Sequence, residues 1–312
     1  MQLLKIAKEV DDIIKPFGEF EVLLFYGIVA EKLSRFLAGR ELAAKNWIPP
    51  APNFKIPYLI KRGSKECPLF IDDFIAAVTP EFLEIRSKTK ALKYAKGKIT
   101  KLQENAWNYF LPRKLSDFFY ATNSEGQGKP IDRLFFDIDR GINMSASQAQ
   151  MAARQLLDII REDEELNILI GKPETGVFWT GRSFHVFIFL KNAKPNSFYV
   201  KYFQSIKNSM NNFTCRWADE IKKETKINVL AGHEKRKNAI TIDPSQTPSG
   251  KLCRAPFSLH MKNAKTVDGV SLPLTRKMLD ENELIKKLNS YTPEKVVKEL
   301  DKFAARLPKK FR

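Results

Sequence analysis

Three aspartates, Asp137, Asp139 and Asp243, are the residues of this sequence best suited to chemistry. Asp137 and Asp139 are two residues apart in the run Leu-Phe-Phe-Asp-Ile-Asp, which is typical of a strand. Because side chains alternate faces along a strand, both carboxylates project to the same side. Two anions on an otherwise apolar strand repel each other and lose hydration, and a bound cation offsets both costs. The pair therefore indicates a metal site, with a solvated strand end as the simpler alternative.

The hard oxygen ligands of such a site favour Mg²⁺ or Mn²⁺. Two of these ions, about 3.5–4 Å apart, can hold an attacking hydroxyl and a leaving pyrophosphate in line. That chemistry usually needs a third carboxylate. Asp243 supplies one at the end of a predicted strand over residues 239–242.

A predicted hairpin over residues 177–190 carries groups that can bind a triphosphate. Around the flexible Gly181 it places the hydroxyls of Thr180 and Ser183, the guanidinium of Arg182 and the imidazole of His185. His185 lies on an arm that is otherwise apolar on both faces, so it must find a polar partner there. A hydrogen-bonded core histidine is the alternative interpretation.

The segment that follows Asp243 adds three candidate nucleotide-binding side chains, Lys251, Arg254 and His260. Each of these features is weak alone. Together, an acidic pair, a phosphate-type hairpin and a third acid followed by cations form the set that metal-assisted phosphoryl transfer requires.

In this order the chain resembles the archaeo-eukaryotic primase superfamily, which has an acidic pair on a strand, a small-Gly-Arg segment leading to His, and an Asp at a strand end. The segment Arg254-Ala-Pro-Phe-Ser-Leu-His260 is similar to the basic-x-Pro-Phe-Ser-x-His segment of the catalytic small subunit of primase. The resemblance covers about residues 131–262.

The resemblance implies that Asp137, Asp139 and Asp243 bind the metal ions. It also implies contacts to the phosphates and sugar of the incoming nucleotide from Arg182, Ser183, His185, Arg254 and His260. Thr180 replaces the usual serine of the family, and the turn is one residue shorter than the Ser-Gly-Arg-Arg-Gly-x-His form of the small subunit.

Primase small subunits often carry a zinc site, and none is indicated here. Cys67, Cys215 and Cys253 are widely spaced without a C-x-x-C pair, so neither a secreted disulfide framework nor a zinc ribbon is indicated, and a bridge between two of them stays open. Small buried hydrophobes are favoured over a metal cluster of Cys215, His233 and Cys253. With its long N-terminal region and basic end, the chain looks more like the primase-polymerase domain of an archaeal plasmid replication protein, as part of a longer polypeptide.

The site residues require a sheet that brings distant strands together. We expect strands over residues 133–139 and 166–170, and helices over residues 198–223 and 273–312. Ser145 and Gln148 form a possible capping box before a further helix. Strands and helices interleave without a βαβ repeat, which favours an α/β (α+β) fold with mixed or antiparallel sheets, as in a primase-polymerase core.

Three regions are predicted along the chain. Residues 1–105 form a helical N-terminal region packed on the core, residues 106–265 the catalytic core, and residues 266–312 a basic helical segment leading to any further domains. Helical spacing covers residues 1–45, interrupted at Gly39, and a proline-rich loop covers residues 47–57. Residues 86–101 hold seven Lys or Arg and no acid, and fit either a phosphate-binding track or a solvated helix face.

The length of the chain and its net charge agree with an enzyme that acts on nucleic acid. The 312 residues carry 53 Lys and Arg against 36 Asp and Glu, a net charge of +17 that favours a polyanionic partner. No apolar run reaches the roughly 20 residues of a membrane span, and no signal peptide opens the chain. We therefore expect a cytoplasmic protein without a membrane partner.

The predicted activity is that of a DNA primase-polymerase in plasmid replication. It adds deoxynucleotides or ribonucleotides to a 3′-hydroxyl on a DNA template and primer, and releases pyrophosphate. An end-joining polymerase or a metal-dependent nuclease built on the same acids is the alternative. A non-catalytic single-strand-binding module is a third reading, in which the carboxylates would repel phosphates unless metal is bound.

Overall fold

A computed structural model describes residues 19–47, 58–63, 66–89, 91–110, 116–126, 128–205, 212–263 and 266–308. Its helices are α2 (Glu19–Leu33), α3 (Ile71–Ala77), α4 (Pro80–Lys88), the 3₁₀ helix η1 (Leu92–Tyr94), α5 (Lys101–Tyr109), α6 (Ala146–Glu162), α7 (Glu164–Ile170), α8 (Asn196–Tyr202), α9 (Phe213–Thr225), the 3₁₀ helix η2 (Arg276–Asp280), α10 (Leu284–Asn289), α11 (Pro293–Lys298) and α12 (Leu300–Ala304). Its strands are β1 (Leu42–Trp47), β2 (Tyr58–Arg62), β3 (Ser116–Ala121), β4 (Ile131–Arg140), β5 (Glu174–Trp179), β6 (Phe184–Lys194), β7 (Val229–Ala231), β8 (Ile240–Asp243), β9 (Leu252–Arg254), β10 (Leu259–Asn263), β11 (Thr266–Val270) and β12 (Leu272–Leu274).

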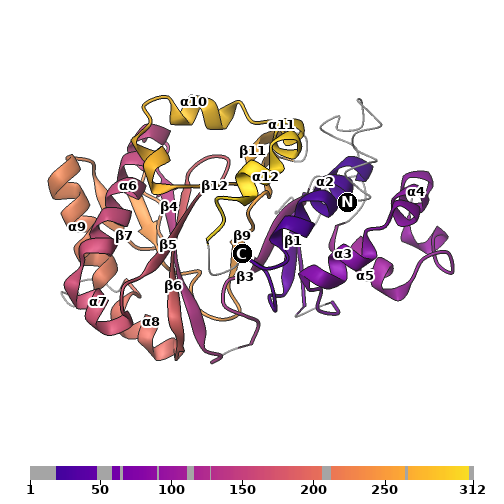
Figure 1. The fold of residues 1–312 in the computed structure, drawn as a ribbon, viewed down its shortest axis with the longest axis horizontal. Helices are drawn as coiled ribbons and strands as arrows, with labels where there is room; N and C mark the ends of the chain where they lie inside the picture. The colour runs from indigo at the N-terminus through magenta and orange to yellow at the C-terminus, as the bar shows by residue number, and fades with distance from the viewer. Residues whose placement is uncertain are drawn as a thin grey trace.

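These strands form two main sheets (Figure 1). The six-stranded sheet has the order β12-β5-β6-β4-β8-β7, with β7 parallel to β8 and the other pairs antiparallel. The four-stranded sheet, β2-β1-β3-β9, is antiparallel throughout, and β10 and β11 form a separate ribbon. The expected α/β (α+β) fold with mixed and antiparallel sheets is confirmed.

The central strand β4 and the helix α6 after it were both predicted correctly. The Ser145 amide donates to the Gln148 side chain at 2.8 Å, and the Gln148 amide donates to the Ser145 hydroxyl at 3.1 Å. This capping box starts α6, which packs its apolar face on β4, β6 and β8. The hairpin of β5 and β6 and the strand β8, which ends at Asp243, are confirmed as well.

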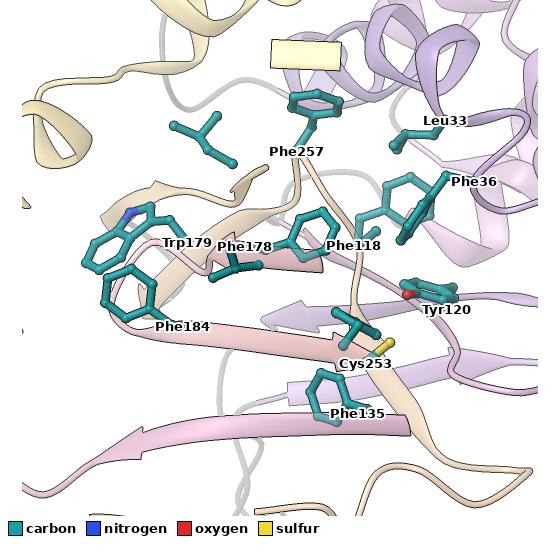
Figure 2. Packing of buried hydrophobic residues seen from close by; sticks show 14 of the residues in the cluster. Leu33, Phe36, Phe118, Tyr120, Phe135, Phe178, Trp179, Phe184, Cys253 and Phe257 are labelled. Atoms are coloured by element: carbon teal, nitrogen blue, oxygen red, sulfur yellow. The ribbon is translucent and has the colours of Figure 1, made fainter. Parts of the chain in front are cut away.

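An aromatic core joins the two sheets (Figure 2). The ring of Phe36, from the turn after α2, lies 5.9 Å from Tyr120 of β3 and 5.7 Å from Phe178 of β5. The guanidinium of Arg133, on β4, lies 5.4 Å from the same Phe36 ring. Packed aromatic contacts of this kind resist sliding, so the two sheets hold a fixed relation to each other.

The chain between β8 and β9 passes from one sheet to the other and is tied down on the way. The hydroxyl of Thr247 accepts from the Phe135 amide at 2.9 Å and donates to the Phe135 carbonyl at 3.1 Å. The Asn123 side chain donates to the Arg133 carbonyl and accepts from the Asp132 amide, at 2.9 and 2.8 Å. Both side chains are buried and replace backbone partners where the chain leaves its sheet.

The predicted strand over residues 166–170 is wrong, because these residues belong to helix α7. The side chain of Asp163 caps the helix by accepting from the Leu166 amide at 2.9 Å. Leu166 is buried in the core whereas Ile168 is 85% exposed, so the apolar run presents only one face inward. A short run of aliphatic residues cannot by itself distinguish a strand from a helix.

Two predicted helices have different extents. The single helix over residues 198–223 is instead α8 and α9, with residues 206–211 outside the described part. The helical pattern predicted over residues 1–45 ends early, since α2 stops at Leu33 and Gly39, at φ +67°, turns the chain into β1. A positive φ is open to glycine at little cost, so this residue marks the change of element.

The N-terminal region is not purely helical, because β2 pairs with β1, and β1 pairs with β3 of the predicted core. One sheet thus spans the first two predicted regions, and the three-region division stays a prediction. The helical prediction for residues 1–18 and the loop prediction for residues 48–57 lie outside the described residues. The expected helical segment at the C-terminal end is wrong at its start, because β11 and β12 take up most of residues 266–274. Residues 276–304 are largely helical, in η2, α10, α11 and α12, and α11 and α12 pack on α2.

Candidate active site

The three aspartates lie side by side on the six-stranded sheet. In the antiparallel register Asp137 of β4 faces Asp243 of β8 on one side and His185 of β6 on the other. Asp139 is two residues further along β4, opposite Thr241, and so shares the face of Asp137. Directly opposed residues in such pairs have neighbouring side chains, so the fold gathers all three carboxylates.

The charges of these aspartates disfavour one another. Burial raises the pKa of Asp137 well above its usual range, and neighbouring Asp139 and Asp243 raise it further, while Lys235 opposes them. Burial also raises the pKa of Asp243, although the amide of Ser245 donates to its carboxylate at 2.8 Å. The positive charge near these three aspartates therefore does not neutralise their combined negative charge.

Lys235 supplies part of that charge from the loop between β7 and β8. Its ammonium lies 2.6 Å from the Asp139 carboxylate, and its side chain is 64% exposed. Within the described residues, no three His, Cys, Asp or Glu side chains are close enough together to ligate one ion without moving. The donor set of hard, mutually repelling oxygens nonetheless suits a divalent cation, which would compete with Lys235 for Asp139.

The turn between β5 and β6 is held by its own hydroxyls. The Thr180 hydroxyl accepts from the Ser183 amide at 3.0 Å, and the Thr180 amide donates to the Ser183 carbonyl at 2.9 Å. The Ser183 hydroxyl donates to the Ile138 carbonyl, between the two acids of β4. Both hydroxyls thus already bind the fold, whereas Arg182 between them is exposed.

Gly181 allows this turn to approach the β10–β11 ribbon. Its φ is +95°, and a Cβ there would lie 2.5 Å from the Cβ of His260 and 3.2 Å from the Gly269 carbonyl carbon. No larger residue fits at that separation. The contact places the His260 ring on the cleft, where burial, with smaller effects of Arg254 and Arg182, lowers its pKa to about 3.

His185 is a buried neighbour of the acids. Its Nε2 lies 3.6 Å from the Asp137 carboxylate, and its ring packs edge-on to Phe135 with centroids 4.8 Å apart. Burial lowers the pKa of His185 well below its ordinary value, and Arg254 and His260 lower it further. The ring therefore favours the neutral form, which can donate or accept a hydrogen bond at the acid cluster.

Arg254 is held on the opposite wall by an acid that the sequence did not reveal. Its guanidinium pairs with Asp117 of β3 at 2.9 Å, donates to the Ser258 hydroxyl at 3.2 Å and lies 5.0 Å from the centre of the Phe119 ring. Burial raises the pKa of Asp117, and the Arg254 charge opposes that rise. Asp117 therefore fixes the direction in which Arg254 presents its charge.

All ten predicted residues line one cavity of about 1060 Å³ between the two sheets. They are Asp137, Asp139, Thr180, Arg182, Ser183, His185, Asp243, Lys251, Arg254 and His260. Their roles stay predictions. The four-stranded sheet adds two cationic lining residues that were missed, Lys45 of β1 and Arg62 of β2.

The comparison with solved structures finds a polymerase. The chain is similar to the polymerase domain of Mycobacterium tuberculosis Ligase D in complex with DNA, with a TM-score of 0.54, 19% sequence identity and 93% of each chain covered. The two share a fold. No protein-family model and no curated protein matches the sequence.

Two remaining predictions concern the cysteines and the membrane. Cys67, Cys215 and Cys253 are all free; Cys253 is buried as expected, but Cys67 is exposed and Cys215 is partly so. The prediction of a small buried hydrophobe is therefore confirmed for Cys253, whereas Cys215 is only partly buried. No helix in the described part of the chain has the length and apolar character needed to cross a bilayer.

Proposed function

We propose that this protein is a template-directed DNA polymerase of the primase-polymerase type. The observation that carries the proposal is the convergence of Asp137, Asp139 and Asp243 on one wall of a cleft whose other wall is cationic. Such a cleft suits a substrate that brings negative phosphates to bound cations. The similarity to the polymerase domain of a ligase and the resemblance to the archaeo-eukaryotic primase superfamily support the same proposal.

Asp137, Asp139 and Asp243 would hold two divalent ions, Mg²⁺ or Mn²⁺. When bound, these ions supply Lewis-acid stabilisation of the charge that develops at the α-phosphate and on the leaving pyrophosphate. The protein's own part is to position the carboxylates, and the Ser183 hydroxyl does this by fixing the Ile138 carbonyl between two of them.

The cationic residues would bind the nucleotide from two directions. Arg182 and Lys251 are exposed at the cleft and can move to meet the β- and γ-phosphates. Arg254 is fixed by Asp117 and presents a constant charge. The buried His185 and the half-buried His260 favour the neutral form, and they would contact the sugar and phosphates as hydrogen-bonding groups without adding charge.

The test is primer extension by the purified chain. A labelled primer on a longer DNA template is incubated with Mg²⁺ or Mn²⁺, and with deoxynucleotides and ribonucleotides in separate reactions. Lengthening of the primer is expected, with loss in the double variant Asp137→Asn, Asp139→Asn. The exposed Asp219→Asn, on α9, is the matched control and should extend normally.

Primer shortening without added nucleotides would instead identify a nuclease. Binding of DNA that is indifferent to divalent ions, with no extension, would identify a non-catalytic module. Undiminished extension by the double variant would remove Asp137 and Asp139 from the mechanism.

An end-joining polymerase is the second candidate, and the similarity to the polymerase domain of a ligase favours it. Synthesis on an unprimed circular single strand separates the two candidates, because only a primase starts chains there. A role in archaeal plasmid replication predicts such synthesis. An end-joining enzyme would instead fill short overhangs at paired DNA ends.

A further inference from the structure

The basic run over residues 86–101 divides in the structure into buried, paired and free charges. Arg86 belongs to the core: it is 3% exposed, donates to the Phe110 carbonyl, and lies 5.4 Å from the centre of the Trp107 ring. It contributes nothing to the surface. One interpretation of the run, a uniform solvated helix face, is therefore wrong for its first residue.

Two further lysines are neutralised by nearby acids. Lys88 lies 2.6 Å from Glu84, and Lys101 lies 2.9 Å from Glu104. Lys90 lies outside the described residues. The lysines of the run that are exposed and have no acidic partner within the described residues are Lys93, Lys96 and Lys98.

These three lysines stand on a firmly anchored turn. Ala95 between them is fully buried, and Leu92 and Ile99 on either side pack against the core. The Ala95 amide donates to the Leu92 carbonyl and the Lys98 amide to the Ala95 carbonyl, each at 2.9 Å. The apolar side chains thus face inward and hold the lysines outward.

An aromatic ring is presented in the middle of these charges. Tyr94 is 62% exposed, and the Lys93 ammonium lies 4.7 Å from its ring centre. A large ring exposed on an ordered turn, with a cation at the same place, is the combination that proteins use to stack an unpaired base beside its phosphate. A membrane surface would call for exposed apolar side chains, and here Leu92 and Ile99 are turned inward.

This turn is separate from the cleft. None of its residues lines the cavity between the sheets. Figure 1 shows α4 and α5, which flank the turn, at the opposite end of the molecule from α9. Any strand bound here is held outside the proposed active site.

We propose that Lys93, Tyr94, Lys96 and Lys98, the α4–α5 patch, bind an unpaired stretch of DNA, with one base stacked on Tyr94 and phosphates held by the lysines. The choice of DNA rests on the proposed function. The patch would hold template beyond the paired region, in a manner tolerant of sequence because every base has a face that can stack.

The test is binding of a labelled oligothymidylate of about 16 nucleotides, measured by fluorescence anisotropy over a series of salt concentrations. In the triple variant Lys93→Gln, Lys96→Gln, Lys98→Gln the slope of log affinity against log salt should fall in magnitude by about 2, since each phosphate contact on a single strand contributes about 0.7. Tyr94→Ser should bind about tenfold more weakly with an almost unchanged slope.

The matched control removes the same charge elsewhere. Lys172, Lys191 and Lys222 are exposed, and their triple glutamine variant should keep a slope closer to that of the parent. Equal losses in the two triple variants would overturn the patch in favour of a general charge effect. Unchanged oligonucleotide binding by the patch variant, with loss of binding to phosphatidylserine vesicles, would overturn it in favour of a membrane.

The patch and the proposed function can fail separately. A parent protein that extends primers, with patch variants that bind as it does, leaves the polymerase standing and removes the patch. A parent that neither extends primers nor binds the oligonucleotide removes both.

Discussion

The two walls of the cleft carry opposite charges, and the charged groups of the two walls have different surroundings. On the six-stranded wall, Asp137, Asp139 and Asp243 lie on one face, and Lys235 pairs with Asp139. On the four-stranded wall, the Arg62 guanidinium lies 4.0 Å from the Glu125 carboxylate. Arg254 pairs with the buried Asp117.

This difference shows that the unfavourable arrangement of charges lies on the wall of the three aspartates. Burial and mutual repulsion raise the pKa of Asp137, a sign that the acid wall is unfavourable as it stands. On the cationic wall, the Arg254 charge opposes the rise that burial causes in the pKa of Asp117. Proteins commonly keep such unfavourable arrangements at functional sites, so the asymmetry itself points to the acid wall as the place where cations bind.

Removing the charge of one acid should cause the largest loss of activity. It should not cause the loss of stability that a substitution at a buried residue usually causes. Asp243→Asn keeps the hydrogen bond from the Ser245 amide but removes a repelling charge. We expect primer extension to fall about a thousandfold. The free energy of unfolding in urea, without metal, should stay equal or rise. A variant that loses activity because it unfolds would contradict the proposed contrast.

Removing the acid of the other wall should do the reverse. Asp117→Ala leaves Arg254 with an unpaired, largely buried charge, and the free energy of unfolding should fall by about 3 kcal/mol. Urea unfolding followed by circular dichroism measures this. Asp117→Asn, which keeps a hydrogen-bond acceptor, should lose less. Equal stability of parent and Asp117→Ala would mean that the cationic wall is not structurally balanced.

A single methyl group added at Gly181, where the β5–β6 turn meets the β10–β11 ribbon, should lower the stability of the protein. Gly181→Ala forces a Cβ to within 2.5 Å of His260, and we expect a loss of about 1–3 kcal/mol in unfolding free energy. Gly39→Ala is the control, because Gly39 also has a positive φ but has nothing within 4 Å of the added atom. A similar loss in both would assign the effect to backbone strain alone.

The smallest expected effect concerns Lys235, the lysine that pairs with Asp139 on the acid wall. Lys235→Ala removes the competitor for Asp139 from an exposed pair, so Mn²⁺ should bind the isolated protein up to about fivefold more tightly. Electron paramagnetic resonance of free Mn²⁺ measures this without any assay of activity. The control is Lys237→Ala, from the same loop, and weaker Mn²⁺ binding by Lys235→Ala would make Lys235 a support of the site instead of a competitor.

The acid wall could be predicted from sequence because a charge on an apolar strand is conspicuous. Asp137 and Asp139 interrupt a run of large hydrophobic residues, and strand alternation alone places them on one face. Their pairing with Asp243 needed the sheet order, which no local pattern contains. The segment from Arg254 to His260 was found through family resemblance.

The cationic wall was missed because its residues look ordinary in sequence. Lys45 and Arg62 lie in a region where the spacing suggested helices, and a lysine is unremarkable in a basic protein. Asp117 could have been found by the logic applied to Asp137, since it precedes Phe118, Phe119 and Tyr120 in a strand. A lone buried acid needs a cation, and the sequence does not say which one.

The ties at Thr247 set the geometry of substrate entry. Residues 244–251 connect the two walls, and Thr247 bridges this link to Phe135 beside the acids through two hydrogen bonds. The link therefore keeps the distance between the two walls fixed. Moving the walls apart would break both hydrogen bonds and disrupt the aromatic packing around Phe36. A long DNA strand must therefore enter through the open mouth of the cleft, end first or from the side, because the two walls do not close around it.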